Sequence, residues 1–202
     1  MSDILLLVFV KKPVAGKVKT RLAASIGNEK ALTVYHALLK HTQQVVEQAN
    51  VPTHVYYADE PAHDDYWNAF EKKQQVGESL GERMANAFRE SFDAGFKRIV
   101  IIGSDTFDLS PALIHEAFQK LMKHDTVIGP AKDGGYYLLG MNTYLPALFL
   151  DKKWSTDSVF QDTLTDIKKG HRSYALLPEL NDIDTIDDLK GTIIDGDMGD
   201  KL

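Results

Sequence analysis

The sequence Ile4-Leu-Leu-Leu-Val-Phe-Val10 runs directly into the basic segment Lys11-Lys-Pro-Val-Ala-Gly-Lys-Val-Lys-Thr-Arg21. The first part is a continuous apolar run, which is typical of a strand buried on both faces of a parallel sheet. The second part has five Lys and Arg residues and no acid, in a chain of formal net charge -6. Because open α/β sheets bind ligands beyond the carboxyl ends of their strands, we interpret this segment as an anion-binding loop. A solvated basic turn is the alternative.

Pro13 and Gly16 shape the turn of this loop. A glycine at position 16 lets the backbone approach a phosphate, so we expect a small phosphorylated ligand. The loop is not a Walker A motif, because Gly16-Lys17 is followed by Val18 and no glycine stands five residues before Gly16. The chain also has no G-x-G-x-x-G motif. The sequence therefore argues against P-loop hydrolysis and against hydride transfer on a Rossmann fold.

The composition indicates one α/β domain over residues 1–202, since 202 residues with 44% hydrophobic content can bury a full core. The absence of cysteine excludes disulfides, thiolate metal sites and cysteine nucleophiles. The acidic balance argues against general nucleic-acid binding. The N-terminal apolar run is too short for a membrane span or a signal peptide, so we expect a cytoplasmic protein. The oligomeric state stays open, a homodimer included.

Hydrophobic patterning predicts alternating strands and helices, with Asn28 as one helix cap and Ser110-Pro111 as the start of another helix. This alternation predicts a three-layer α/β/α fold with a mostly parallel sheet. The strands on either side of Asp133-Gly-Gly135 indicate an antiparallel excursion. The polar stretch 58–75 is expected to hold a short helix. Strands are expected at 4–10, 53–57, 98–103, 126–129, 136–141 and 173–177, and helices at 28–49, 80–94, 110–123, from 155 or 156 to 169, and from 185.

Asp105 follows the predicted strand 98–103 within Gly103-Ser-Asp105. A carboxylate at this end of a strand faces the ligand crevice, and hard oxygen ligands hold Mg²⁺ or Mn²⁺ on substrate phosphates. The alternative is an Asp that caps a turn.

The last 25 residues form an acidic segment from which Asp184 could supply a second carboxylate to the metal. Asp182 and Asp184 share one face of a short extended stretch. Thr185 with Asp188 resembles a capping box, although such a box normally ends in Glu or Gln. The alternative is an acidic solvated tail that also includes Asp195, Asp197 and Asp200.

Two further groups are candidates for ligand contact. The first group consists of Lys132, Asp133, Gly134 and Gly135. It offers a positive charge, a hydrogen-bond acceptor and bare backbone N–H groups, which would suit a sugar or a phosphate. The alternative is a hairpin turn, for which Asp-Gly-Gly is equally favoured. Glu82-Arg83 follows a glycine at a helix start and could reach a base, ribose or phosphate, although surface capping fits as well.

Several motifs in the same order resemble a family of GT-A-like transferases, described as radical-SAM/selenodomain-associated transferases or glycosyltransferases. These motifs are Phe9-Val-Lys-Lys-Pro-Val-Ala-Gly-Lys-Val-Lys-Thr-Arg-Leu22, Leu80-Gly-Glu-Arg-Met84, Gly103-Ser-Asp105, the stretch His124–Gly140 with Asp-Gly-Gly-Tyr-Tyr, Trp154-Ser-Thr156 and Asp182-Ile-Asp-Thr185. The resemblance implies a nucleotide-diphospho-sugar transferase fold, which molybdenum-cofactor and 2-phospholactate guanylyltransferases also use.

The resemblance also implies roles for single residues. Asp105 is the implied metal ligand and Asp184 its partner. The implied nucleotide and phosphate loop is Pro13 to Arg21, including Gly16 and Thr20, with Lys17, Lys19 and Arg21 on phosphates. Ser104 is a further candidate nucleotide-binding residue. This chain departs from the family at Phe107, where a Pro is usual, and it lacks a strict Asp-x-Asp.

Together these features predict a transferase that depends on Mg²⁺ or Mn²⁺, with a nucleotide donor and a small-molecule acceptor. Lys19 and Arg21 would stabilise developing negative charge, and Asp133 would accept the proton of an acceptor hydroxyl. Glycosyl transfer and nucleotidyl transfer both fit. The alternative is a nucleotide-binding or regulatory module without turnover, which Phe107 and the missing Asp-x-Asp favour.

Overall fold

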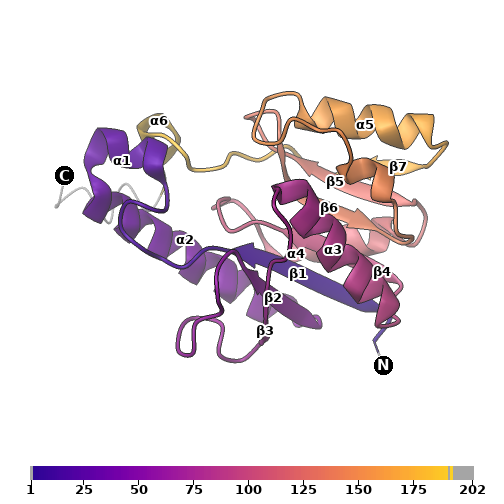
Figure 1. The fold of residues 1–202 in the computed structure, drawn as a ribbon, viewed down its shortest axis with the longest axis horizontal. Helices are drawn as coiled ribbons and strands as arrows, with labels where there is room; N and C mark the ends of the chain where they lie inside the picture. The colour runs from indigo at the N-terminus through magenta and orange to yellow at the C-terminus, as the bar shows by residue number, and fades with distance from the viewer. Residues whose placement is uncertain (1, 191, 193–202) are drawn as a thin grey trace.

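The apolar run at the start of the chain forms β1 (Ile4–Val10), an inner strand of a seven-stranded sheet. The computed structural model describes residues 2–190 and 192, and Figure 1 shows their arrangement. Strand β6 runs antiparallel to β4 and β5, whereas the other pairs are parallel, so the predicted mostly parallel sheet is confirmed. The sheet order is β3-β2-β1-β4-β6-β5-β7, with β2 (Thr53–Tyr57), β3 (Glu71–Gln74), β4 (Arg98–Ile102), β5 (Thr126–Pro130), β6 (Tyr136–Met141) and β7 (Tyr174–Leu176).

Helices cover both faces of the sheet, which confirms the three-layer prediction. One face carries α2 (Asn28–Ala49) and α4 (Pro111–Lys120), and the other carries α3 (Leu80–Asp93), the 3₁₀ helix η1 (Pro146–Phe149) and α5 (Val159–Lys169).

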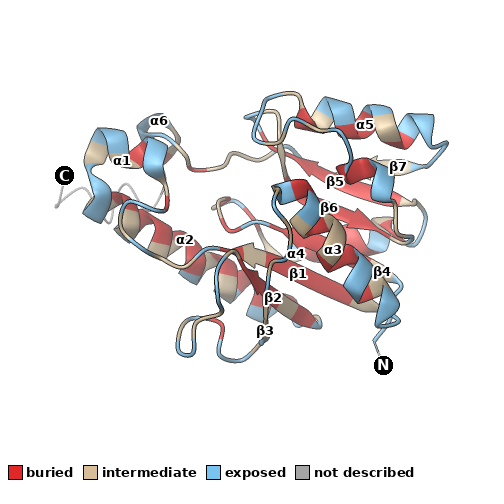
Figure 2. Ribbon diagram, in the orientation of Figure 1, coloured by how far each residue is buried: buried red, intermediate tan, exposed pale blue. Residues whose placement is uncertain are grey.

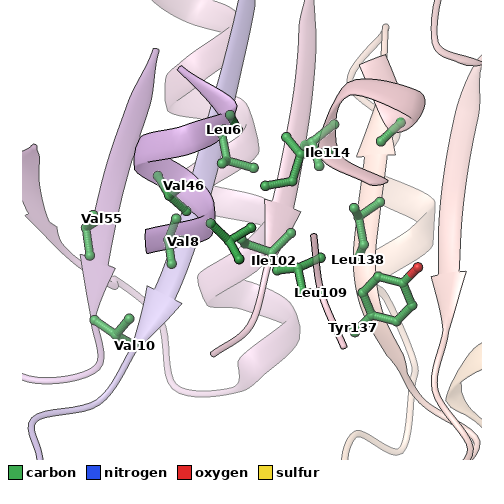
Figure 3. Packing of buried hydrophobic residues seen from close by; sticks show 14 of the residues in the cluster. Leu6, Val8, Val10, Val46, Val55, Ile102, Leu109, Ile114, Tyr137 and Leu138 are labelled. Carbon is green, nitrogen blue, oxygen red and sulfur yellow. The ribbon is translucent and has the colours of Figure 1, made fainter. Parts of the chain in front are cut away.

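Strand β1 is buried on both faces, because its side chains alternate between the two helical layers (Figure 2). Leu6, Val8 and Val10 belong to the cluster beneath α2 and α4, part of which is seen in Figure 3. Leu5 and Leu7 belong to the cluster beneath α3 and α5. Each such buried side chain contributes roughly 1.5–3 kcal/mol of hydrophobic stabilisation, so the apolar run suffices to hold this strand inside the sheet.

Two short helices, α1 (Thr20–Ile26) and α6 (Ile186–Leu189), form a smaller cluster with the first half of α2. Leu22 of α1 packs there with Ile183 and Leu189 from the end of the chain. Figure 1 shows α6 beside α1. This packing brings the acidic C-terminal segment to the basic loop that follows β1.

Three predictions of local structure were wrong. The stretch 58–75 contains the edge strand β3 rather than a short helix; β3 pairs with β2 although its sequence Glu-Lys-Lys-Gln has no apolar alternation. The expected cap at Asn28 is the first residue of α2, and Gly27 holds the N-cap position. Helix α5 begins at Val159 rather than at 155 or 156, because Ser155 adopts a positive φ of 63° and the segment 154–158 forms turns.

Two capping predictions were right. Ser110 caps α4 through its side chain with Pro111 in the first turn. Thr185 and Asp188 form a reciprocal capping box on α6. The acidic residues Asp195, Asp197 and Asp200 lie outside the described residues. No helix within residues 2–190 and 192 is long and apolar enough to cross a membrane.

Candidate functional site

A cavity of about 810 Å³ opens at the carboxyl ends of β1 and β4. Its walls also include the start of α1, the loop that leads into α3, the β5–β6 hairpin, the segment 154–157 and the C-terminal segment around Asp182. The residues of the expected site that line it are Lys19, Thr20, Arg21, Arg83, Ser104, Asp105, Asp133, Gly135 and Asp184.

Lys19 joins the two carboxylates that the sequence suggested as metal ligands. Its Nζ lies 2.6 Å from Asp105 Oδ1 and 3.0 Å from Asp184 Oδ1. The Lys19 side chain is 3% exposed, whereas those of Asp105 and Asp184 are 48% and 39% exposed. Arg21 Nη1 stands 3.9 Å from Asp184 Oδ2, with a side chain that is 69% exposed. The basic loop therefore meets an acidic pair inside the cavity.

Lys19 stays protonated in this position. Burial alone would lower the pKa of its ammonium, but the charges and hydrogen bonds of Asp105 and Asp184 outweigh burial and raise the pKa above its usual value.

The chain path explains how Asp105 and Asp184 meet. The backbone N–H of Ile183 donates to the carbonyl of Asp105 at 2.9 Å, and Thr106 forms an isolated antiparallel bridge with Asp182. The side chain of Ile183 is anchored among α1 and α2. The segment 182–184 is therefore fixed against the turn after β4 by both backbone and side chain.

Asp182 is a cavity residue that the sequence reasoning left out of the expected site. Thr106 Oγ1 donates a hydrogen bond to its Oδ1. Burial raises the pKa of Asp182 to about 6; the Thr106 hydrogen bond opposes this, and the charges of Asp105 and Asp133 add to it. The alternation Asp182-Ile-Asp184, which places both side chains on one face, was the signal that could have found it.

Gln75 is a second cavity residue that was not predicted. Its Nε2 donates to the carbonyl oxygens of Tyr56 at 3.0 Å and Val10 at 3.4 Å, at the ends of β2 and β1. Carbonyl oxygens only accept hydrogen bonds, so these two partners fix the orientation of the amide. No donor within residues 2–190 and 192 hydrogen-bonds to its Oε1, and Gln75 lines the cavity wall.

Arg83 lines the same end of the cavity, and Glu82 does not. Arg83 Nε donates to the Gly77 carbonyl at 2.9 Å, which anchors the guanidinium. Glu82 instead accepts a hydrogen bond from the backbone N–H of Glu78 at 2.7 Å. Glu82 thus makes a local capping contact, which was the alternative to ligand contact for this residue.

The Asp133-Gly134-Gly135 segment forms the turn of the β5–β6 hairpin. The expectation that it offers bare backbone N–H groups was wrong: Gly134 N donates to Ala131 O at 3.1 Å and Gly135 N to Asp133 Oδ1 at 2.8 Å. Gly134 has a φ of 85°, and a Cβ there would overlap the backbone of Asp157. The hairpin therefore packs tightly on the segment 154–158. Asp133 lines the cavity, and Lys132 is exposed outside it.

Residues 12–17 of the basic loop lie outside the main cavity. Lys17 and Gly16 are exposed, and Gly16 has a φ of 75°, which a glycine adopts without strain. Pro13 lines a separate cavity of about 360 Å³ beside α2. Of the expected loop 13–21, only the part from Val18 onward lines the main cavity.

Phe107, the departure from the family pattern, turns away from the cavity. Its ring lies 4.4 Å from the His41 ring between centroids, and it packs against the cluster of α1, α2 and α6. Since Phe107 is absent from the cavity wall, this substitution leaves the acidic pair in place.

The donor set at Asp105 and Asp184 suits a divalent cation that takes few ligands from the protein. No group of three or more His, Cys, Asp or Glu residues capable of holding a metal occurs in the described part of the chain. Mg²⁺ is commonly held by one or two carboxylates together with substrate phosphates. Two half-exposed aspartates beside a cavity fit that pattern, with Lys19 between them as a competing cation.

Comparison with known proteins gives a family and a fold. Residues 40–156 match DUF2064, described as an uncharacterized protein conserved in bacteria. No curated protein matches the chain. A solved structure from Desulfovibrio desulfuricans G20, described as a putative nucleotide-diphospho-sugar transferase, is 36% identical over 94% of this chain and 85% of its own, with a TM-score of 0.88.

Two solved structures of lower identity share the fold. CMP:2-keto-3-deoxy-manno-octonic acid synthetase, complexed with CTP, is 9% identical over 100% of both chains, with a TM-score of 0.57. Rv0371c from Mycobacterium tuberculosis H37Rv, complexed with manganese, is 14% identical over 93% of this chain and 96% of its own, with a TM-score of 0.54. These likenesses confirm the GT-A-like resemblance, and the chain belongs to the DUF2064 family on the nucleotide-diphospho-sugar transferase fold.

Proposed function

We propose that this protein is a transferase that binds a nucleotide donor in the main cavity and transfers a glycosyl or nucleotidyl group to a small acceptor. The observation that carries the proposal is the meeting of Lys19 and Arg21 with Asp105 and Asp184 at the carboxyl ends of β1 and β4. In open α/β sheets this edge is where nucleotides bind. The fold shared with the structure described as a putative nucleotide-diphospho-sugar transferase and with a CTP-bound synthetase supports the same placement.

Lys19 and Arg21 are the residues we assign to the donor phosphates. Both line the cavity, and the Arg21 side chain, which is 69% exposed, can turn from Asp184 toward a ligand. Arg binds phosphate oxygens in a bidentate manner, whereas Lys acts as a compact point charge. These cations would stabilise the negative charge that develops on the leaving phosphate.

Asp105 and Asp184 are the residues we assign to a Mg²⁺ or Mn²⁺ ion that arrives with the donor. When bound, such an ion would neutralise phosphate charge and act as a Lewis acid. The manganese in the Rv0371c structure supports a metal on this fold.

The cavity end near Gln75 and Arg83 suits the nucleobase. Gln75 Oε1 offers a fixed acceptor for a base N–H, and Arg83 offers donors for a base carbonyl or ring nitrogen. Leu80, which is 43% exposed and lines this end, gives an apolar surface for the flat face of the base.

The part of the cavity wall formed by Asp133 and the segment 155–157 suits the acceptor. In nucleotidyl transfer an acceptor hydroxyl would attack the α-phosphorus, its proton would pass to Asp133, and pyrophosphate would leave. In glycosyl transfer the hydroxyl would attack the anomeric carbon, and a nucleoside diphosphate would leave. The same cations serve either leaving group.

A ligand panel tests this proposal. Thermal unfolding would be measured with each nucleoside triphosphate and with nucleotide sugars, with and without Mg²⁺ or Mn²⁺. A ligand at 100 times its Kd stabilises by about 2.7 kcal/mol, which is readily seen. We expect stabilisation by at least one nucleotide and its loss in Arg21→Met, while Arg89→Met, an exposed control on α3, keeps it. No shift with any nucleotide would overturn the proposal, and the preferred donor class separates the two reactions.

A further inference from the structure

The position of Lys19 Nζ raises the question of how a metal could reach Asp105 and Asp184. The ammonium is within hydrogen-bond distance of Oδ1 of both carboxylates at once. Mg²⁺ binds oxygen at about 2.0–2.1 Å in near-octahedral geometry. A metal bound to these two oxygens would therefore lie against a positive charge, and like charges in a poorly solvated place repel strongly. The ammonium and the metal compete for one position.

Lys19 does not leave this position without help. Its side chain is 3% exposed, and its described ion pairs are those with Asp105 and Asp184. Removing both partners would leave a buried, uncompensated charge, which is strongly unfavourable. The neighbouring carboxylate of Asp182 already accepts the hydrogen bond of Thr106. A metal ion alone therefore cannot displace the ammonium at low cost.

A polyphosphate removes this obstacle because it offers Lys19 a new anionic partner. Lys19, Thr20 and Arg21 form one continuous stretch of the cavity wall. The Lys19 backbone stays where it is, since its carbonyl accepts the N–H of Ala23 in α1 at 2.8 Å. The four-carbon side chain can move its ammonium by rotamer changes alone. Its left-handed backbone, φ 48° and ψ 44°, is a rare conformation for a non-glycine residue and is typical of functional and switch sites.

We infer that Lys19 is an internal cation that keeps the Asp105–Asp184 pair closed to divalent metal until a polyphosphate draws its ammonium away. Nucleotide and metal then bind with positive coupling, and by linkage each raises the affinity of the other equally. This inference rests on the proposed function, because it places a nucleotide's phosphates beside Lys19.

Mn²⁺ binding without any phosphate is the direct test, followed by electron paramagnetic resonance of free Mn²⁺. We expect wild-type protein to bind Mn²⁺ at least tenfold more weakly than Lys19→Met, in which the carboxylate pair is open. Lys17→Met is the matched control: it removes one cation from the same loop but outside the cavity, and we expect wild-type affinity. Equal Mn²⁺ affinity in wild type and Lys19→Met would overturn the inference.

A second measurement needs no change at Lys19. In metal-free solution, ¹⁵N-lysine NMR of the wild type should show the buried Lys19 ammonium, and inorganic tripolyphosphate should shift that signal. Tripolyphosphate should also bind Asp184→Asn several-fold more tightly than Asp157→Asn by calorimetry. Both variants remove one carboxylate from the cavity wall, but only Asp184 holds Lys19. An unmoved ammonium signal with tripolyphosphate bound, or equal affinities in the two variants, would overturn the inference.

These experiments distinguish failure of the inference about Lys19 from failure of the proposed function. If Mn²⁺ binds wild type and Lys19→Met equally while nucleotides still stabilise the protein, the inference fails and the proposed function stands. If neither tripolyphosphate nor any nucleotide binds, the proposed function and polyphosphate-driven opening both fail, and the Mn²⁺ comparison alone decides whether Lys19 excludes the metal.

Discussion

The indole of Trp154 lies directly on Gly81, so that a Cβ at residue 81 would overlap the indole Nε1 and Cε2 atoms. Gly81 is buried in the first turn of α3, and Trp154 is a half-buried residue of the cavity wall. The missing side chain of Gly81 thus sets the position of Trp154.

Gly81→Ala should displace Trp154 toward solvent. Alanine favours the helix by about 1 kcal/mol, which offsets part of the cost of the clash. We expect acrylamide to quench tryptophan fluorescence more strongly in the variant, because Trp67 is 1% exposed and contributes little to quenching. Trp154→Phe in the same background should abolish the increase. Unchanged quenching would mean that the indole moves to another buried position in the cavity wall rather than toward solvent.

Thr106→Val should destabilise the protein by about 2 kcal/mol at pH 7.5, since a hydrogen bond to a charged, buried group is typically worth that much. Valine keeps the volume of the 4% exposed Thr106 but cannot donate to Asp182. Urea unfolding measures the loss. Thr106→Ser keeps the donor and should retain most of the stability, so equal losses in both variants would show that packing rather than the hydrogen bond matters.

Gln75→Leu should weaken nucleotide binding five- to tenfold and leave inorganic tripolyphosphate affinity unchanged. The reason is that one hydrogen bond from the base to Oε1, worth about 1 kcal/mol, is lost while the phosphate contacts remain. Calorimetry of both ligands gives the two affinities. Gln74→Leu, which changes the exposed neighbour outside the cavity, is the control. A parallel loss of tripolyphosphate binding would argue against a base contact.

As the pH falls below about 6.5, His54 should lower the stability of the wild type relative to His54→Gln. Burial lowers the pKa of His54 below its usual 6.5; Glu71 and Glu90 oppose this shift, and Lys73 adds to it. Below pH 6.5 the His54 side chain thus binds more protons in the unfolded chain than in the folded protein, so its contribution to stability falls as the pH falls. Urea unfolding from pH 7.5 to 5.5 would show this difference in slope. Parallel slopes for the two proteins would contradict the assignment to His54.

The sheet was predictable from the sequence because its inner strands are made by local apolar runs. The side chains of β1 are apolar throughout, so that burial on both faces is readable from the local sequence. Helix α1 and strand β3 were not predictable, because other segments stabilise them. Helix α1 is held by Leu22 against α2 and the C-terminal segment. Strand β3 is held by backbone pairing with β2 and by polar side-chain contacts such as His54 with Glu71.

The candidate site was predictable in its residue types but not in its pairings. A basic loop after the first strand, Asp105 after β4 and Asp184 near the end of the chain are all visible in the sequence. That Lys19 joins the two carboxylates is not visible, because the fold decides it over a separation of 165 residues from Lys19 to Asp184. Gln75 was missed for the same reason, since its amide is oriented by backbone carbonyls of two other strands.

The separation of Lys19 from Asp184 in the sequence also determines when their contact can form during synthesis of the chain. At about 5–20 residues per second, a ribosome needs roughly ten to thirty seconds to translate the 165 positions between them. Until then the nascent chain carries Lys19 and Asp105 without the carboxylate that completes the cluster, and α1 lacks its contacts with Ile183 and Leu189. The cluster of Lys19, Asp105 and Asp184 therefore forms only after Asp184 has emerged from the exit tunnel.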